Sequence, residues 1–175
     1  MSAVPFTLRL AEPGDWPLYR AVRLRALQDA PDAFGSSYAA EAGRADAQWA
    51  ERVAAARSSG FDRLVLAVQD GTVCGLVWCK RSAAEPARAD LFQMWVDPAA
   101  RGLGIGAALL DDVLAWAAQA GAERVCLGVT TTNSAALRLY VRHGFRAAGP
   151  TALLREGADL RVQPMALQLD VGCAG

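Results

Sequence analysis

The 175-residue sequence predicts a mixed α/β domain, with a central sheet of about six to seven strands flanked by about four helices. Three observations predict it. Short strand-like runs are interspersed with longer runs of helical periodicity. The dipeptide Asp70-Gly71 separates two strand-like runs and is a strong signal for a two-residue hairpin. A glycine-rich segment, RGLGIGAALL at 101–110, leads directly into an amphipathic run.

One strand and two helices are expected before the hairpin. Residues 7–10 alternate as a short strand, and Asp15 is a suitable N-cap for a helix that runs to about Asp29. Pro31 breaks that helix. Apolar residues at helical spacing then predict a second helix over roughly 47–58.

From the hairpin onward, strands and helices alternate. Two strands, 64–69 and 72–80, flank the hairpin turn, and a third is expected over 90–96. A helix over 105–120 follows the glycines. The remaining expected elements are a strand at 124–130, a short helix at 134–144, a strand at 145–149, and a final strand in which Met165, Leu167 and Leu169 alternate. This order requires a sheet whose strands change their pairing direction.

The composition is that of an ordinary globular protein. The 18 basic side chains balance the 18 acidic ones, which argues against broad binding to nucleic acid or to an anionic membrane. No apolar run reaches the ~18 residues that a membrane span needs, and the N-terminus lacks the pattern of a secretory signal. The four cysteines, Cys74, Cys79, Cys126 and Cys173, show no C-x-x-C spacing. We therefore expect a reduced, cytoplasmic protein with one domain over 1–175 and a core over about 7–169.

The glycine-rich segment raises the question of what approaches the backbone at Gly102 and Gly104. A nucleotide P-loop is excluded because it requires a lysine beside the glycines, and Lys80 is the only lysine. A dinucleotide fingerprint is matched formally, with Ala107 as its last position. However, the segment follows the fourth strand instead of the first, and Glu123 precedes the next strand, whereas the fingerprint places an acidic residue at the end of that strand. A pyrophosphate bound by backbone N–H groups at the helix N-terminus, or a tight turn without a ligand, both remain open from these residues alone.

The residues around the glycines carry a resemblance to a known family. Residues 93–110, QMWVDPAARGLGIGAALL, and 133–145, NSAALRLYVRHGF, resemble the GNAT superfamily of acetyl-CoA-dependent N-acetyltransferases. The family motif Q/R-x-x-G-x-G/A is matched by Arg101, Gly104 and Gly106, and its second element by Asn133, Ala136, Tyr140, Gly144 and Phe145. The resemblance extends over about residues 7–169. It implies the GNAT fold, with a sheet that is splayed between the strands at 90–96 and 124–130.

The resemblance implies a site for acetyl-CoA as co-substrate, and no metal. The pyrophosphate of coenzyme A would be bound at Arg101, Gly102, Leu103, Gly104, Ile105 and Gly106. The preceding strand would bind the pantetheine amides through backbone groups freed at a bulge, at Met94, Trp95 and Val96, whose side chains belong mostly to the core. Asn133 would hydrogen-bond the pantetheine arm, and Ala136 and Tyr140 belong to the same cofactor-binding set.

Tyr140 and Asp90 are the catalytic residues that the resemblance suggests. Tyr140 would donate a proton to the leaving thiolate, a role that suits a phenol with a pKa of ~10. Its other interpretation is an aromatic residue that packs on the sheet. Asp90 would accept the proton of the attacking ammonium group, but it is equally well explained as a surface acid, and a water chain needs no single base. The only histidine, His143, is expected at a solvated helix end, so neither a zinc site nor a Ser-His-Asp hydrolase is expected.

The acceptor is expected beside the segment that joins the first two helices, residues 29–42. Phe34, Tyr38 and Glu41 would frame an amine there, although packing in a connecting segment explains each of them equally well. The leading function is transfer of the acetyl group of acetyl-CoA to a primary amine of a small molecule or peptide, by direct attack in a ternary complex. The alternative is a non-catalytic acyl-CoA sensor, which the presence of Tyr140 disfavours. A different acyl group and a homodimer, which is common among GNAT proteins, remain open; no nucleic acid or membrane partner is expected.

Overall fold

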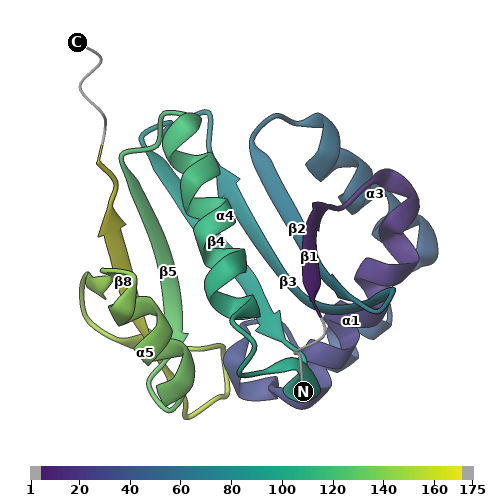
Figure 1. Ribbon diagram of the computed structural model, residues 1–175. Coiled ribbons are helices and arrows are strands. Elements are labelled where there is room, and N and C mark those ends of the chain that lie inside the picture. The colour runs from purple at the N-terminus through teal and green to yellow at the C-terminus, as the bar shows by residue number, and fades with distance from the viewer. Residues whose placement is uncertain (1–4, 171–175) are drawn as a thin grey trace.

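The computed structural model describes residues 5–170, apart from the side chain of Ser134, as one mixed sheet with helices on both faces (Figure 1). The strands are β1 (Phe6–Leu10), β2 (Asp62–Gln69), β3 (Thr72–Arg81), β4 (Arg88–Val96), β5 (Arg124–Thr130), β6 (Arg146–Ala147), β7 (Ala152–Leu153) and β8 (Arg161–Gln168). The α-helices are α1 (Trp16–Asp29), α2 (Tyr38–Ala42), α3 (Asp46–Ser58), α4 (Ile105–Gln119) and α5 (Ser134–Arg142). Cys173 lies outside the described residues.

The sheet has the order β1-β2-β3-β4-β5-β8-β6, with β7 also paired to β8. Neighbouring strands are antiparallel except β4 and β5, which are parallel, so the predicted change of pairing direction is confirmed. The hairpin between β2 and β3 turns at Asp70 and Gly71, with φ values of 50° and 73°. Positive φ at both positions is what a two-residue turn of the favoured hand requires.

The parallel pair β4–β5 is short, and this positions the site. The two strands pair only at Arg88 with Arg124, Ala89 with Val125 and Asp90 with Cys126. Beyond Asp90 the strands diverge, which confirms the predicted splay between the strands at 90–96 and 124–130. The parallel pair stands between antiparallel neighbours, so the split lies inside the sheet and not at its edge.

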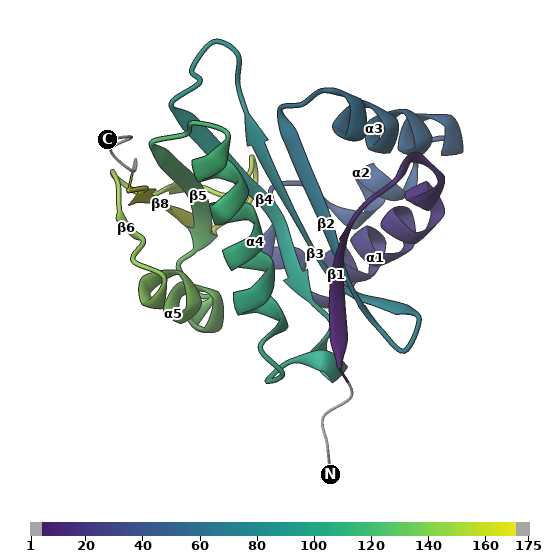
Figure 2. The ribbon, with the colours of Figure 1, turned by 45° about the horizontal axis from the view of Figure 1, so that its top comes forward.

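Two cores lie on the two faces of the sheet. Alternate residues of β2 enter different cores: Val65 packs in the core beneath α4, and Leu64 and Leu66 pack in the core beneath α1 and α3. The second core also contains the fully buried Trp49 of α3. Figure 2 shows α4 across the middle of the sheet, with α5 beside β5 and β8, and the group α1–α3 on the other side of β1.

The observed elements differ from the expected ones mainly where they are short. Eight strands and five α-helices are present among the described residues, against about six to seven and about four expected. The additional elements are β7, with two residues, and α2, with five, whereas β6 is the strand expected at 145–149, reduced to two residues. Segments this short carry no measurable periodicity, because one helical turn alone needs 3.6 residues.

Candidate active site

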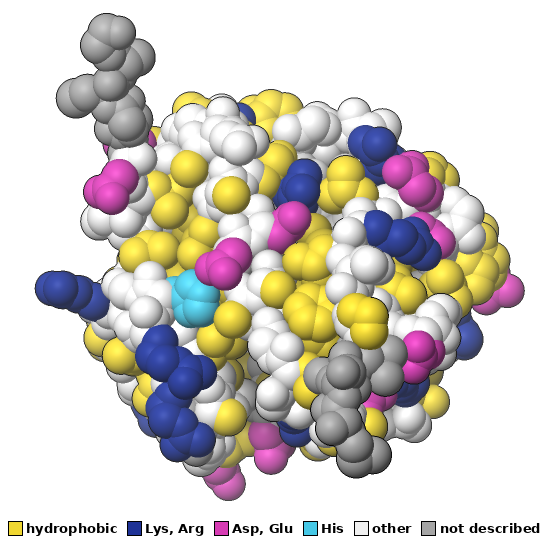
Figure 3. All heavy atoms as spheres, viewed as in Figure 1, with side chains coloured by type: hydrophobic (Ala, Val, Ile, Leu, Met, Phe, Trp, Pro, Cys, Tyr) yellow, Lys and Arg dark blue, Asp and Glu magenta, His cyan; other side chains and the backbone are white. Residues whose placement is uncertain are grey.

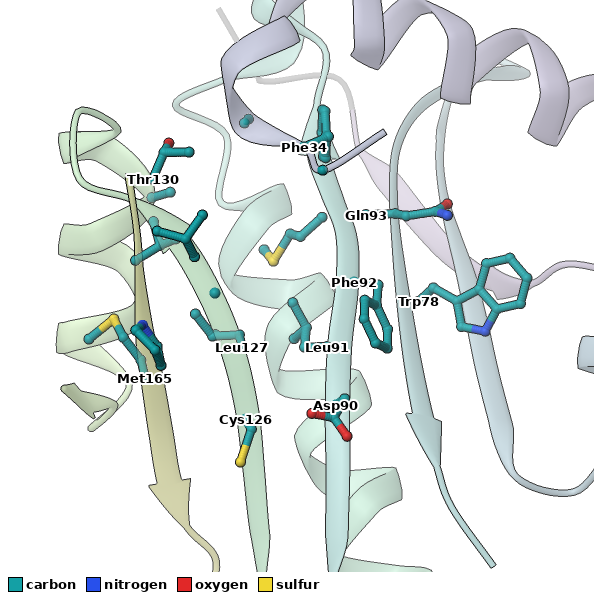
Figure 4. Close-up of a pocket in the computed structure, with 18 of the residues that line it drawn as sticks. Phe34, Trp78, Asp90, Leu91, Phe92, Gln93, Cys126, Leu127, Thr130 and Met165 are labelled. Atoms are coloured by element: carbon teal, nitrogen blue, oxygen red, sulfur yellow. The ribbon is translucent and has the colours of Figure 1, made fainter. Parts of the chain in front are cut away.

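A cavity of about 840 Å³ opens where β4 and β5 separate (Figure 4). It is lined from both faces of the sheet. Trp78 and Phe92 contribute from the face that carries α1 and α3, and Leu91 and Met94 contribute from the face that carries α4. Met165 of β8 lies on the opposite wall, on the side of β5 that faces away from β4. A cavity of this size with mixed walls suits a small-molecule substrate.

A β-bulge in β4 shapes the middle of the cavity wall. Phe92 pairs with Trp78 and Trp95 pairs with Leu76, so β4 has two residues where β3 has one. The extra residue is Gln93, whose φ of 57° lies in the left-handed region. Phe92 and Trp95 therefore lie on the same face although they are three residues apart. Figure 4 shows the Gln93 side chain pointing away from β5. The bulge thus precedes the predicted pantetheine-binding segment directly.

Tyr140 and Asn133 reach the cavity from α5. The Tyr140 side chain is 7% exposed, its ring packs edge-on against Phe145 at a centroid distance of 5.7 Å, and its hydroxyl makes no hydrogen bond to a described residue. Burial raises the pKa of Tyr140 above its ordinary value of 10.0, so the phenol stays protonated at neutral pH. Asn133 is the N-cap of α5, where its side-chain oxygen accepts the N–H of Ala136 at 3.2 Å. All three predicted α5 residues therefore line one cavity.

Asp90 lies at the end of the cavity where β4 and β5 are still paired (Figure 4). Its carboxylate forms an ion pair with Arg88 at 2.7 Å and remains partly exposed. It is the one acidic side chain on the cavity wall among the described residues. The position suits a group that receives a proton from an amine in the cavity, and the same carboxylate also neutralises Arg88.

The glycine loop supplies free backbone donors at the start of α4. Gly102 and Gly104 have φ values of 83° and 82°, which L side chains rarely adopt. Gly106 differs from these two: a Cβ there would make an ordinary van der Waals contact with the Leu139 side chain at 3.4 Å, where α4 approaches α5. The N–H groups of residues 102–106 donate no hydrogen bond to a described residue. Together with the helix dipole, such donors suit a phosphate group.

The arginine of this motif is fixed by protein contacts. The guanidinium of Arg101 donates to Asp29 at 2.7 Å and to the carbonyl oxygen of Val96 at 3.0 Å. Asp29 also accepts the indole N–H of Trp95 at 2.9 Å, so one carboxylate joins α1, β4 and the glycine loop. The Trp95 side chain is buried in the core, and Met94 lines the cavity. Arg101 therefore holds the loop in place through its Nη and Nε contacts.

Of the three residues expected beside the acceptor, Phe34 alone lines the cavity. Tyr38 is exposed on α2, away from the cavity wall. Glu41 turns inward on the same short helix, is 1% exposed, and accepts two hydrogen bonds from Arg23 at 3.0 and 3.1 Å. The contribution of Glu41 to the site is indirect, since Arg23 itself lines the cavity.

Sequence reasoning missed a wall formed by Trp78, Phe92 and Arg52. Phe92 is 47% exposed although it lies in the middle of a strand. The guanidinium carbon of Arg52 lies 5.9 Å from the ring centre of Trp49 and 5.7 Å from that of Trp78. The only signal in the sequence is that Arg52 follows Trp49 by three residues, which places it beside the buried stripe of α3. Any amphipathic helix shows such a residue.

Histidine-dependent and metal-dependent chemistry have little support in the described residues. His143 lies at the C-terminal end of α5, where Nε2 contacts Asp111 at 3.0 Å, and Figure 3 shows the histidine beside an acidic side chain. No group of three or more His, Cys, Asp or Glu side chains between residues 5 and 170 is arranged to hold a metal ion. In the same range, no helix has the length and apolarity to cross a membrane.

Solved structures of acetyltransferases share this fold. The structure of an acetyltransferase of the GNAT family from Streptococcus pneumoniae superimposes with a TM-score of 0.83 at 25% identity, covering 94% of this chain and 100% of the other. A putative acetyltransferase from Salmonella typhimurium, solved with its cofactor acetyl-CoA, gives a TM-score of 0.79 at 21% identity and covers 98% of both chains. The split sheet and its cavity thus have the architecture of GNAT acetyltransferases.

Sequence comparison places the chain within that class. The family model described as Acetyltransferase (GNAT) family matches residues 24–145. The chain therefore belongs to the GNAT acetyltransferase family. It is 32% identical over 146 residues to a mycothiol acetyltransferase of Brachybacterium faecium, covering 82% of this chain and 41% of that protein. It is 37% identical over 95 residues to an uncharacterized N-acetyltransferase of Mycobacterium tuberculosis, covering 54% and 59%. The chain spans less than half the length of the mycothiol acetyltransferase.

Proposed function

We propose that this protein transfers the acetyl group of acetyl-CoA directly to a primary amine of a small molecule or peptide. One observation carries the proposal: the Tyr140 hydroxyl, without a hydrogen-bond partner among the described residues, shares a cavity with the partly exposed carboxylate of Asp90. A proton donor and a proton acceptor in one cavity are what an amine-acylating site needs.

The residues present fit acetyl-CoA in three places. The free N–H groups of 102–106 at the start of α4 suit its pyrophosphate. Beyond Asp90, β4 lacks a hydrogen-bonding partner on its β5 side, which leaves backbone groups for the pantetheine amides. Tyr140 lines the cavity at the end of that gap. When bound, acetyl-CoA supplies an activated thioester.

The proposed roles of the side chains follow from where protons must move during the transfer. The amine nitrogen forms a bond to the acetyl carbon while the C–S bond breaks. Asp90, directly or through water, takes the proton that the amine loses, and Tyr140 gives its proton to the departing sulfur. A backbone N–H at the bulge beside Gln93 polarises the acetyl carbonyl, because oriented donors stabilise a developing oxyanion. The raised pKa of Tyr140 keeps its proton available at neutral pH.

The first experiment follows thiol release and product mass with acetyl-CoA and a panel of amines. We expect an acetylated product with at least one amine, and a kcat in Tyr140→Phe that falls by roughly a hundredfold, as for loss of a general acid, with unchanged affinity for acetyl-CoA. An unchanged kcat in this variant would remove the role of Tyr140.

Cys126 provides the control for direct transfer. This half-buried free thiol lines the cavity in register with Asp90, so a covalent acetyl-enzyme would involve it. Direct attack predicts that Cys126→Ser retains activity. Binding of acetyl-CoA, seen as a higher melting temperature, without reaction of any amine would favour a sensor.

A further inference from the structure

The wall of the cavity carries more basic than acidic side chains. Four cations line the cavity, namely Arg23, Arg52, Lys80 and Arg88, against one acid, Asp90. The chain as a whole is balanced, with 18 basic and 18 acidic residues, so the excess is local. Clefts lined by one sign of charge attract ligands of the other sign.

Three of the four cations have carboxylate partners in the protein. The pairs are Arg88 with Asp90 at 2.7 Å, Arg23 with Glu41 at 3.0 Å, and Lys80 with Asp62 at 3.8 Å. Arg52 has neither an ion pair nor a hydrogen bond to a described residue. It is therefore the cation that accounts for the local excess.

Arg52 is held by aromatic rings instead of by an acid. Its guanidinium lies near Trp49 of α3 and Trp78 of β3, while its Nη1 atom is buried without a hydrogen-bond partner. Arg23, whose side chain is 3% exposed and also lines the cavity, likewise has a buried Nη1 atom without a partner. Unsatisfied buried donors are unfavourable, and donors of a charged group most of all. Both guanidinium groups line one cavity wall, and that of Arg52 has no counter-charge among the described residues, so an anionic oxygen acceptor in the cavity would supply one.

We propose that Arg52, assisted by Arg23, binds a carboxylate on the acceptor, so that the acceptor is an amine of the amino-acid type. This inference rests on the proposed acetyl transfer. The planar guanidinium matches a carboxylate with two parallel hydrogen bonds. The amine of the same molecule then lies toward Asp90, the one acid on the wall among the described residues. Arg52 then binds the carboxylate of the acceptor, and Asp90 accepts the proton that its amine loses.

The test separates binding of the acceptor from its chemistry. The probes are the standard amino acids, β-alanine and γ-aminobutyrate, each beside its carboxamide, which differs in charge at one end only. Melting temperature is titrated with each probe in the presence of coenzyme A, which requires no reaction. Thiol release from acetyl-CoA is measured in parallel.

We expect at least one acid to bind more tightly than its carboxamide by roughly tenfold or more, as the loss of a charge-assisted hydrogen bond implies. Arg52→Gln should abolish that preference, and Arg52→Lys, which keeps the charge but not the planar fork, should reduce it. Arg57→Gln is the matched control on α3: this side chain is 47% exposed and pairs with Glu12, outside the cavity. It should keep the preference.

Equal binding of acids and carboxamides, or an undiminished preference in Arg52→Gln, overturns the inference and leaves the proposed transfer standing. Acid-selective binding that depends on Arg52, without thiol release from any amine, supports the inference about the ligand and counts against catalysis.

Discussion

Gln93 shows how a single residue can shape a site through its backbone conformation. A non-glycine residue with a positive φ stores strain on the order of 1–3 kcal/mol, so the surroundings must hold it. Part of that support is the hydroxyl of Tyr19, which donates to the Gln93 side-chain oxygen at 2.8 Å. Tyr19 is 0% exposed and packs edge-on between Trp49 and Trp78. The bulge is thus tied to the core beneath α1 and α3.

Tyr19→Phe tests this support. The ring packing remains, while the partly buried amide of Gln93 loses a donor, which costs about 1 kcal/mol in the free energy of unfolding. We expect a lower kcat with little change in KM for the acceptor, since the role proposed for the bulge is to position the acetyl carbonyl. Urea denaturation and steady-state kinetics check both. Tyr38→Phe, on the exposed face of α2, should change neither quantity.

At this scale the sequence predicted some residues and missed others for physical reasons. Tyr140, Asn133 and Ala136 were predicted from the resemblance of residues 133–145 to the second GNAT motif, and all three line one cavity. Gln93 was not, since its conformation depends on the register of β4 against β3 and on a contact with Tyr19, 74 residues earlier in the chain. The inward turn of Glu41 was likewise unpredictable, because its partner Arg23 lies on another helix.

Among the elements, the glycine loop requires glycine at two of its three glycine positions. Gly102 and Gly104 provide backbone conformations that other residues avoid, whereas a Cβ at Gly106 would meet its neighbours at ordinary contact distances. The sequence indicated that something approaches the backbone here, and it correctly placed the helix that follows. It did not distinguish Gly106 from the other two glycines, since the space beside Gly106 depends on the position of Leu139 in α5.

Gly104→Ala should weaken acetyl-CoA binding beyond its effect on stability. A Cβ at φ of 82° costs about 1–2 kcal/mol, and relaxation of the loop moves the free N–H groups. Gly157→Ala is matched for strain, with φ of 77° and open space around it, but lies outside the loop. Isothermal titration with acetyl-CoA should show a weaker Kd for the first variant alone. Equal affinities would mean that the loop conformation is irrelevant to binding.

The whole molecule is stabilised by two cores that the sheet separates. One buried ion pair, between Arg23 and Glu41, links α1 to α2. Burial alone would raise the pKa of Glu41, but the hydrogen bonds and charge of Arg23 outweigh it and hold that pKa below the ordinary 4.5. A lowered carboxyl pKa contributes stability that is fully present above the unfolded value and is lost as the pH falls through the folded value.

Glu41→Gln should therefore destabilise the protein by about 3 kcal/mol near neutral pH, because a buried Arg23 loses its counter-charge. The difference from wild type should shrink below about pH 4.5 as the wild-type carboxylate becomes protonated. Urea unfolding at neutral and acidic pH measures it. Glu51→Gln, an exposed position on α3, is the control. A difference that does not change with pH would show that the charge of Glu41 is not what stabilises the pair.

The short pairing of β4 with β5 has a consequence for self-association. From Leu91 to Val96, β4 is paired to β3 alone, so a row of amide and carbonyl groups faces the gap inside the sheet. Chemically this row resembles the free edge of a β-sheet, which recruits strands from other chains and promotes aggregation. A bound molecule with amide groups of its own, as proposed for the co-substrate, would fill that row as a surrogate strand. Saturation with such a ligand would then protect the protein from aggregation as well as prepare it for transfer.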